Sequence, residues 1–287
     1  MDKLIKQLEN LKHLFTLAKK KDAATSKEKS QICSTICELV HNNDVKLHQN
    51  YPFVFGQVFE ALFSLCDDPI ADVRIVADES INTIIRNCCL EGSLTRVHVE
   101  LYKEIKRNGP ARSIRSAFTK FAVLVCQIKP QKCRIFATNL TPCLLTLIQR
   151  PEESISACLE KEGTKIFRHL GRFFNDEELR SLIEKILPNL QLSSAQARRC
   201  ASNFLIDICN FCRKRMFFVV YLLKRLIKSM IPVYANENYH QMVGIFNVLR
   251  MLIPILKEFD GINESKFNES LDIRDDHLIK VKYFKIS

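Results

Sequence analysis

The feature that most constrains this sequence is a helix-forming pattern that returns about every forty-one residues. Its clearest instance is the stretch 67–85, where Asp67, Asp68 and Pro69 precede apolar residues at helical spacing. A carboxylate that can cap free N–H groups, followed by a proline where no N–H is needed, predicts the start of a helix. The apolar face behind it cannot be buried within one helix, so it requires neighbouring helices of the same kind.

Such neighbours occur at a steady interval. Each landmark position lies in a helical pattern that is followed by a breaker and a second apolar helix. A period in the low forties with two helices per unit is typical of HEAT and armadillo repeats. We therefore predict an all-α fold, a HEAT/armadillo-type α-solenoid of about six helical pairs; the alternative is an irregular helical bundle. The landmarks are Ile32-Cys33, Val73-Arg74, Ile114-Arg115, Ile155-Ser156 and Ala197-Arg198, and one further step reaches 237–253.

The pattern divides the chain into an amphipathic N-terminal helix (1–20), a HEAT-repeat array (21–259) and an irregular tail (260–287). The tail loses the period and ends in an alternating, strand-like segment. The lysine-rich stretch 19–29 predicts a polar linker. Helices are expected near 27–42, 51–66, 70–90, 93–107, 111–128, 131–149, 152–173, 176–191, 194–213, 215–233 and 237–259.

The N-terminal helix has an apolar stripe, formed by Leu4, Leu8, Leu11 and Phe15, beside a lysine-rich face. A basic amphipathic helix of this kind can lie in a membrane interface or enter a groove of a partner protein. Alternatively, it packs on the first repeat. The sequence leaves both interpretations open.

The net charge of +11 results from 43 basic and 32 acidic residues, and the excess is unevenly spread. The stretch 103–134, here called the basic run, contains a single acidic residue, Glu104. Such a run attracts anionic partners, which include acidic proteins, lipid headgroups and nucleic acids. The basic residues are Lys103, Lys106, Arg107, Arg112, Arg115, Lys120, Lys129, Lys132 and Arg134, and a second group lies at 213–228.

Arginines recur at the landmarks, as Arg74, Arg115 and Arg198. The interpretation that we favour is an internal ladder, in which they pair with acidic residues such as Asp72 or Glu153 and tie one repeat to the next. The other is that they face a partner. Ser156 interrupts the series.

The sequence contains no P-loop, G-x-S-x-G or H-E-x-x-H motif, and we expect neither catalysis nor a cofactor. Asp78 and Glu79 diverge by about 100° on a helix, which predicts a solvated face or partners for an arginine of a neighbouring repeat. Cys209 and Cys212 have zinc-like spacing, but no second pair completes a metal site. The twelve cysteines are expected to serve mostly as small buried apolar residues.

Within 101–153 the residues become specific enough to compare with a known family. The segments LYKEIKRNG, ARSIRSAF, KPQKCR and QRPEES, with DVRIVADES upstream, resemble the N-terminal HEAT region of the huntingtin family. Members of that family are very large, so the chain corresponds to their first few repeats. Where vertebrate members carry a glutamine tract and a proline-rich segment, this chain has its lysine-rich stretch, so the resemblance does not imply polyglutamine behaviour.

The resemblance implies a non-catalytic scaffold that links vesicle-transport adaptors and autophagy machinery in the cytoplasm and the nucleus. A nucleic-acid-binding helical repeat and a nuclear-transport-type adaptor are the alternatives, and nucleic acid is the less favoured partner. Residues 237–259 carry more apolar surface than one preceding repeat covers. We expect this surface to drive self-association, unless the tail caps it.

Overall fold

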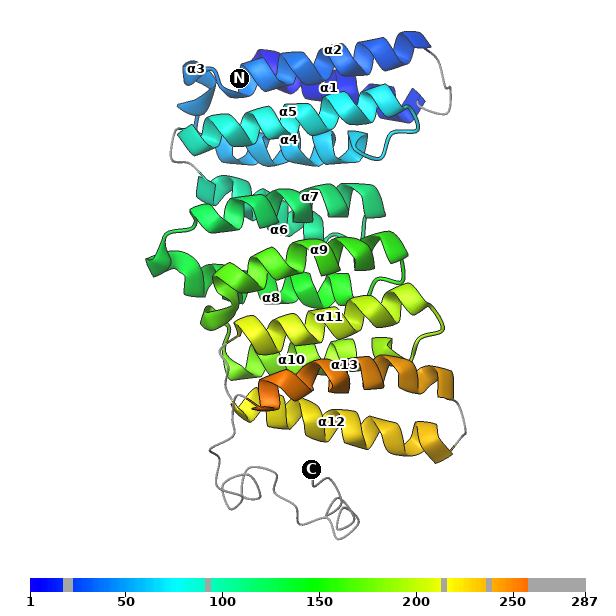
Figure 1. The fold of residues 1–287 in the computed structure, drawn as a ribbon. Coiled ribbons are helices and arrows are strands. Elements are labelled where there is room, and N and C mark those ends of the chain that lie inside the picture. The colour runs from blue at the N-terminus through cyan, green and yellow to red at the C-terminus, as the bar shows by residue number, and fades with distance from the viewer. Residues whose placement is uncertain (18–22, 91–93, 213–215, 236–238, 258–287) are drawn as a thin grey trace. The chain divides into compact units, whose positions relative to one another are not determined.

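The described part of the chain is almost entirely helical (Figure 1). The computed structural model describes residues 1–17, 23–90, 94–212, 216–235 and 239–257, and side chains for 1–10, 26–90, 94–212, 218–231 and 242–256. No strand occurs among these residues, which confirms the predicted all-α class. The helices are α1 (Asp2–Leu17), α2 (Ala23–Val40), α3 (Asn43–Lys46), α4 (Tyr51–Leu65), α5 (Ala71–Leu90), α6 (Leu94–Lys106), α7 (Ala111–Leu124), α8 (Cys133–Ile148), α9 (Glu153–Leu170), α10 (Asp176–Ile186), α11 (Ala195–Phe211), α12 (Met216–Ala235) and α13 (Tyr239–Lys257), with 3-10 turns η1 (Val125–Gln127), η2 (Pro130–Lys132), η3 (Gly171–Phe173) and η4 (Leu187–Gln191).

Each helix predicted from the repeat pattern has a counterpart, and local signals explain where several of them begin. Before α5, the Asp68 side chain accepts a hydrogen bond from the Ile70 main chain at 2.9 Å. Before α10, Asn175 and Glu178 cap each other's main-chain N–H groups. These side chains satisfy donors that a helix start leaves without an intrahelical partner. Pro188 lies in η4, after α10 has ended.

The chain forms two compact units, residues 1–158 and 159–287. In the first unit α1 packs on α2, α4 on α5, and α6 on α7, so consecutive helices form antiparallel pairs (Figure 1). The pairs stack, because α2 packs on α5, α4 on α6, and α6 on α8. First helices therefore lie beside first helices, and second helices beside second helices.

The core of the first unit is built from residues that recur every helical turn. On α4, the rings of Tyr51, Phe55, Phe59 and Phe63 follow one another at centroid distances of 5.6, 5.0 and 6.0 Å. All four side chains are buried. An apolar row at i, i+4 spacing is the expected way for a helix to bury one face against its neighbours.

In the second unit α10 packs on α11, α12 on α13, and α11 on α13. Gly244 of α13 lies against η4 so closely that an added Cβ would come 2.3 Å from the carbonyl oxygen of Leu190. Only a residue without a side chain permits this approach. None of the described helices of the protein is long and apolar enough to span a bilayer.

The predicted polar linker at 19–29 is wrong in its second half, because α2 begins at Ala23. Residues 23–29 contain alanine, lysine and glutamate but no glycine or proline, so helix formation outweighs their polarity. Lys29 is buried with an exposed fraction of 3%. The predicted tail at 260–287, with its strand-like end, lies outside the described residues.

Candidate interaction surfaces

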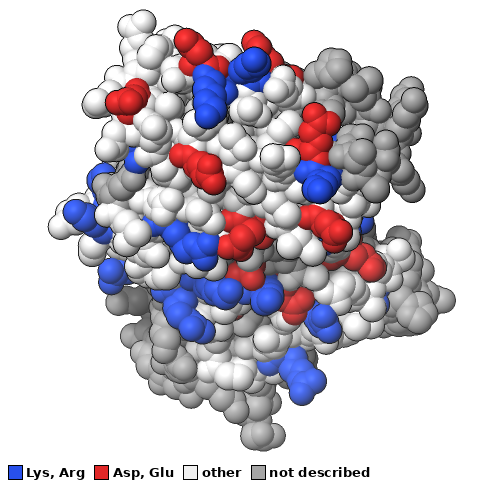
Figure 2. Space-filling view, turned by 90° about the horizontal axis from the view of Figure 1, so that it is seen from above, with Lys and Arg blue, Asp and Glu red and all other residues white. Residues whose placement is uncertain are grey.

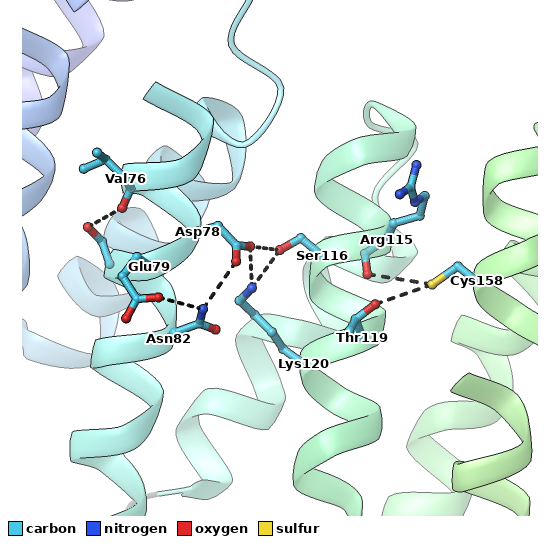
Figure 3. Close-up of polar contacts among 10 residues, drawn as sticks. Val76, Asp78, Glu79, Asn82, Arg115, Ser116, Thr119, Lys120 and Cys158 are labelled. Carbon is cyan, nitrogen blue, oxygen red and sulfur yellow. Dashed lines mark hydrogen bonds and ion pairs between the residues drawn. The ribbon is translucent and has the colours of Figure 1, made fainter. Parts of the chain in front are cut away.

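A polar network links α5 to α7 in the first unit (Figure 3). Oδ1 of Asp78 accepts a hydrogen bond from Ser116 Oγ at 2.7 Å and one from Lys120 Nζ at 2.5 Å. Burial would raise the pKa of Asp78, but the hydrogen bonds from Lys120 and Ser116 lower it below its usual range. The Lys120 side chain is only 9% exposed. This lysine therefore serves the contact between repeats rather than the outer surface.

A separate set of contacts joins α7 to the start of α9 through a cysteine (Figure 3). Cys158 Sγ lies 3.6 Å from the Thr119 hydroxyl and donates a hydrogen bond to the Arg115 carbonyl at 3.9 Å. Between α2 and α5, Cys37 Sγ donates to the Ser80 carbonyl at 3.8 Å. Weak thiol donors thus join residues that are about one repeat apart.

The second unit has an equivalent network between α9 and α11. Glu160 accepts hydrogen bonds from Asn203 Nδ2 at 2.6 Å and Cys200 Sγ at 3.0 Å, and Thr164 donates to Asp207 at 2.5 Å. These residues do not stand out in their local sequence, although the repeat carries a signal for them. Asp78, Thr119 and Glu160 each stand five positions after a landmark, so the polar position recurs with the repeat.

The predicted arginine ladder is wrong in its partners. Arg74 Nη1 donates to the carbonyls of Asp68 and Pro69 at 2.7 and 3.0 Å. Arg198 Nη1 makes the same pair of bonds to Leu192 and Ser193, both at 2.7 Å. Each arginine thus closes the loop before its own helix instead of reaching the next repeat. Asp72 lies exposed in the first turn of α5, where a negative charge complements the helix dipole.

In the third pair, α6 and α7, a different arginine binds the carbonyl of the loop between the two helices. Arg115 is exposed on α7, and the loop carbonyl of Gly109 instead accepts a hydrogen bond from Arg150 Nη1 at 3.0 Å. Arg150 follows α8 and is held by Glu152, at 2.5 Å. Here an arginine does tie one repeat to the next, but from a position that the landmark series does not contain.

Replacing Arg74 by alanine is expected to lower the free energy of unfolding by about 1–2 kcal/mol, because two loop carbonyls lose a charged donor. Urea denaturation followed by circular dichroism measures the change. The matched control is Arg115→Ala, at the equivalent landmark, which should change stability by less than about 0.5 kcal/mol. Equal effects of the two changes would contradict the loop-closing role of Arg74.

Replacing Asp78 by asparagine is expected to cost about 1–3 kcal/mol, because the buried ammonium group of Lys120 loses its carboxylate. The control is Glu79→Gln, on the next residue of the same helix, whose partner Arg86 is 63% exposed. That change should be nearly neutral. If both variants melt alike, the contact between α5 and α7 does not depend on the charge of Asp78.

The basic run does not form one continuous basic surface. Lys103, Arg107, Arg112 and Lys120 each lie within 4 Å of an acidic residue, respectively Glu100, Glu60, Asp67 and Asp78. Lys103, Lys106, Arg107 and Arg112 lie at the α6–α7 turn, whereas Lys129, Lys132 and Arg134 lie beyond the other end of α7. A helix of 14 residues separates the two groups by about 21 Å. On the face shown in Figure 2, most of the described surface is uncharged, and basic side chains lie beside acidic ones in several places.

The N-terminal helix α1 packs on the first repeat, which is one of the two arrangements that the sequence left open. Leu4 and Leu8 have exposed fractions of 0% and 2%, since α1 packs on α2 and α4. The side chains of Leu11 and Phe15 lie outside the described ones. Membrane contact through this stripe stays a prediction, and it would require α1 to leave its pair.

On α13, about half of the predicted apolar stripe is buried. Met242, Ile245, Leu252 and Ile255 pack inward. The exposed members are Val243, Phe246 and Ile253, at 44%, 50% and 43%. The surface that remains for self-association is therefore narrower than the sequence predicts.

The cysteines are free, and most are buried. Burial raises the pKa of the Cys33, Cys66 and Cys143 thiols to about 12, which keeps them protonated. The pKa of Cys209 is raised to about 12 for the same reason. Among the described residues, no group of three or more His, Cys, Asp or Glu side chains is arranged to hold a metal ion. The pair Cys209 and Cys212 thus lies in the core, as small apolar residues do.

Comparisons with known proteins point to one family. A family model described as "Huntingtin, N-terminal HEAT 1" matches residues 62–214, just over half of the chain. Huntingtin of Takifugu rubripes is 36% identical over 271 residues, which are 90% of this chain and 8% of that protein. The HD protein homolog of Dictyostelium discoideum is 28% identical over 191 residues, 61% of this chain and 6% of that protein. The chain thus spans less than a tenth of the length of these relatives.

Among solved structures, a designed armadillo repeat protein is similar at 16% identity, with 87% of this chain and 98% of that chain covered and a TM-score of 0.39. The family match and the stacked antiparallel pairs confirm the predicted HEAT/armadillo-type α-solenoid.

Proposed function

Because the chain belongs to the family of huntingtin N-terminal HEAT regions, we propose that it is a non-catalytic scaffold that binds several proteins at once. The observation that supports this proposal is the match of the family model to the array itself. In such an array each repeat contacts its neighbours only, so its outer helix faces stay available to partners.

The contacts within the array support the same function. Polar pairs such as Asp78 with Lys120 and Glu160 with Asn203 are used between repeats, about forty residues apart. They hold the helices of neighbouring repeats in contact. A scaffold needs a surface of lasting shape, and a network of this kind supplies one.

The finer proposal is that the partners are adaptor proteins of vesicle transport and of autophagy, met in the cytoplasm and in the nucleus. It rests on the family, and the relatives are far longer than this chain. We further propose that α1 can make peripheral membrane contact when it detaches, and that α13 can mediate self-association through Val243, Phe246 and Ile253.

The test is simultaneous binding. Purified chain is immobilised, saturated with one adaptor protein, and then exposed to a second one in a surface plasmon resonance experiment. A scaffold gives additive responses, whereas one shared site gives competition. Binding of at most one adaptor at any time would overturn the scaffold proposal.

The nucleic-acid alternative is less well supported, because the basic run is split and several of its members have acidic partners. It makes a distinct quantitative prediction. Binding to DNA should weaken log-linearly with salt, with a slope set by the number of phosphates contacted. A shallow slope or no binding favours the protein scaffold. A nuclear-transport-type adaptor would share the fold. Because such a protein would bind a single partner at a time, the simultaneous-binding experiment would show competition for it.

A further inference from the structure

The outer face of the first helices α4, α6 and α8 carries three exposed apolar side chains, one on each helix. Phe53 is 70% exposed, Val99 44% and Ile135 61%. Most of the other large apolar residues of these helices are buried. We call Phe53, Val99 and Ile135 the apolar row.

The three helices lie side by side and run in the same direction (Figure 1). Between α4 and α6, Arg96 lies over the Tyr51 ring at 4.9 Å, and Arg107 pairs with Glu60 at 3.3 Å. Between α6 and α8, the rings of His98 and Phe136 are 4.6 Å apart. Residue numbers thus increase together along the helices.

This register places the apolar row at similar heights on adjacent helices. Phe53 follows Tyr51 by two residues and Val99 follows Arg96 by three, while Ile135 directly precedes Phe136. Packed helices lie about 8–10 Å apart, so the row spans roughly 20 Å. A helix laid across it would present side chains at i, i+7 and i+14, which are about 10.5 Å apart.

The charge around the apolar row is basic. Arg96 and Lys106 are exposed on α6, as is Lys103, which also pairs with Glu100 at 2.8 Å, and Lys132 is exposed immediately before α8. The acidic residues of α6 point inward, since Glu100 and Glu104 are 7% and 5% exposed. Neither η2 nor α8 contains an acidic residue. Glu60 is the one acidic side chain exposed on the described parts of these helices, and Arg107 pairs with it.

We propose that the outer face of α4, α6 and α8 docks an acidic amphipathic helix of a partner protein. Its apolar side chains would lie on Phe53, Val99 and Ile135, and its carboxylates would meet Arg96, Lys103, Lys106 and Lys132. A helix fits better than a lipid surface because the row is a single line of separate side chains at helical spacing, whereas a membrane favours a broad apolar face. This inference deepens the proposed scaffold function by naming one surface and the chemistry of its partner.

The probe is a fluorescein-labelled helical peptide with leucine at every seventh position and glutamate beside the leucines, and fluorescence anisotropy measures its binding to the full chain. Combined replacement of Phe53, Val99 and Ile135 by serine is expected to weaken binding at least about tenfold. Because these side chains are already exposed, the melting temperature should stay unchanged. The matched control is Ile75→Ser, on the second helix α5, where an isoleucine is 66% exposed but lies outside the row.

Three outcomes would overturn the proposal. The triple variant binds the peptide as tightly as the unchanged chain; a peptide of the same composition with scattered leucines binds equally well; or phosphatidylserine vesicles bind in place of the peptide and lose binding in the triple variant. If the peptide fails while two adaptor proteins still bind together, the docking surface is wrong and the scaffold survives. If the peptide binds but no two proteins do, the surface stands and the scaffold fails.

Discussion

Replacing Lys29 by methionine is expected to lower the free energy of unfolding by about 3–5 kcal/mol, the usual cost of removing one partner of a buried ion pair. Lys29 Nζ on α2 lies 2.6 Å from Oδ2 of Asp68, and the two side chains are 4% and 3% exposed. The substitution keeps most of the apolar stem but leaves a carboxylate without a cation in the interface between two pairs. A urea titration followed by circular dichroism at 222 nm is the measurement.

A matched control is an exposed ion pair with the same distance between its nitrogen and oxygen atoms. Arg86 and Glu79 also lie 2.6 Å apart, but their side chains are 63% and 59% exposed. Arg86→Met should therefore cost no more than about 1 kcal/mol. Similar losses in the two variants would show that burial does not set the strength of the Lys29 pair.

A double variant separates pairing from packing. Asp68 also holds the Ile70 N–H through Oδ1, so Lys29→Met with Asp68→Asn removes the buried charge but keeps an acceptor there. The double variant should lose less free energy of unfolding than the two single variants together, because Asp68→Asn removes the carboxylate that Lys29→Met leaves unpaired. Strict additivity would mean that the two groups do not interact.

The Lys29 pair also shows what the sequence could and could not predict. Apolar periodicity and breakers determine where helices form, so the repeat and the helix positions follow from the sequence alone. Lys29, however, looks like a solvated lysine in a polar stretch. Its burial depends on how α2 packs against the loop before α5, which local composition does not contain.

The landmark arginines likewise show which contacts the sequence can and cannot predict. Arg74 and Arg198 recur with the repeat and share a role, but that role is to close their own loops through main-chain carbonyls, not to pair with the next repeat. Recurrence alone does not indicate the partner, since every residue has a main-chain carbonyl and the sequence does not show which one accepts the bond. The apolar row cannot be recognised in the sequence for a different reason. It becomes a row only when three helices about forty residues apart are set side by side.

The largest dependence of stability on pH is expected from His98, which lies in the core of the first unit. Its side chain is 2% exposed and contacts the rings of Phe121 and Phe136, with centroid distances of 5.7 and 4.6 Å. Neither ring nitrogen has a hydrogen-bond partner in the described part of the chain. Burial lowers the pKa of His98 from 6.5 to about 4.

The direction of the change in stability with pH follows from the protonation of His98 in the folded and unfolded chain. Above pH 6.5 the imidazole is neutral in both the folded and the unfolded chain, so its ionisation costs nothing. Below that pH the unfolded chain binds a proton that the folded chain does not, and stability falls until pH passes the folded pKa near 4. The shift corresponds to a loss of about 3 kcal/mol.

Urea denaturation midpoints measured between pH 7 and pH 4 test this expectation. Because burial raises the pKa of other carboxyl groups, such as Glu104 and Asp207, these groups also contribute to the pH dependence. The informative quantity is therefore the difference between the unchanged chain and His98→Leu. The leucine variant cannot bind the proton, so its stability should exceed that of the unchanged chain by a margin that grows by about 3 kcal/mol as the pH falls. A margin that stays constant from pH 7 to pH 4 would mean that His98 accepts its proton in the folded core, and that the Phe121–Phe136 environment does not exclude charge.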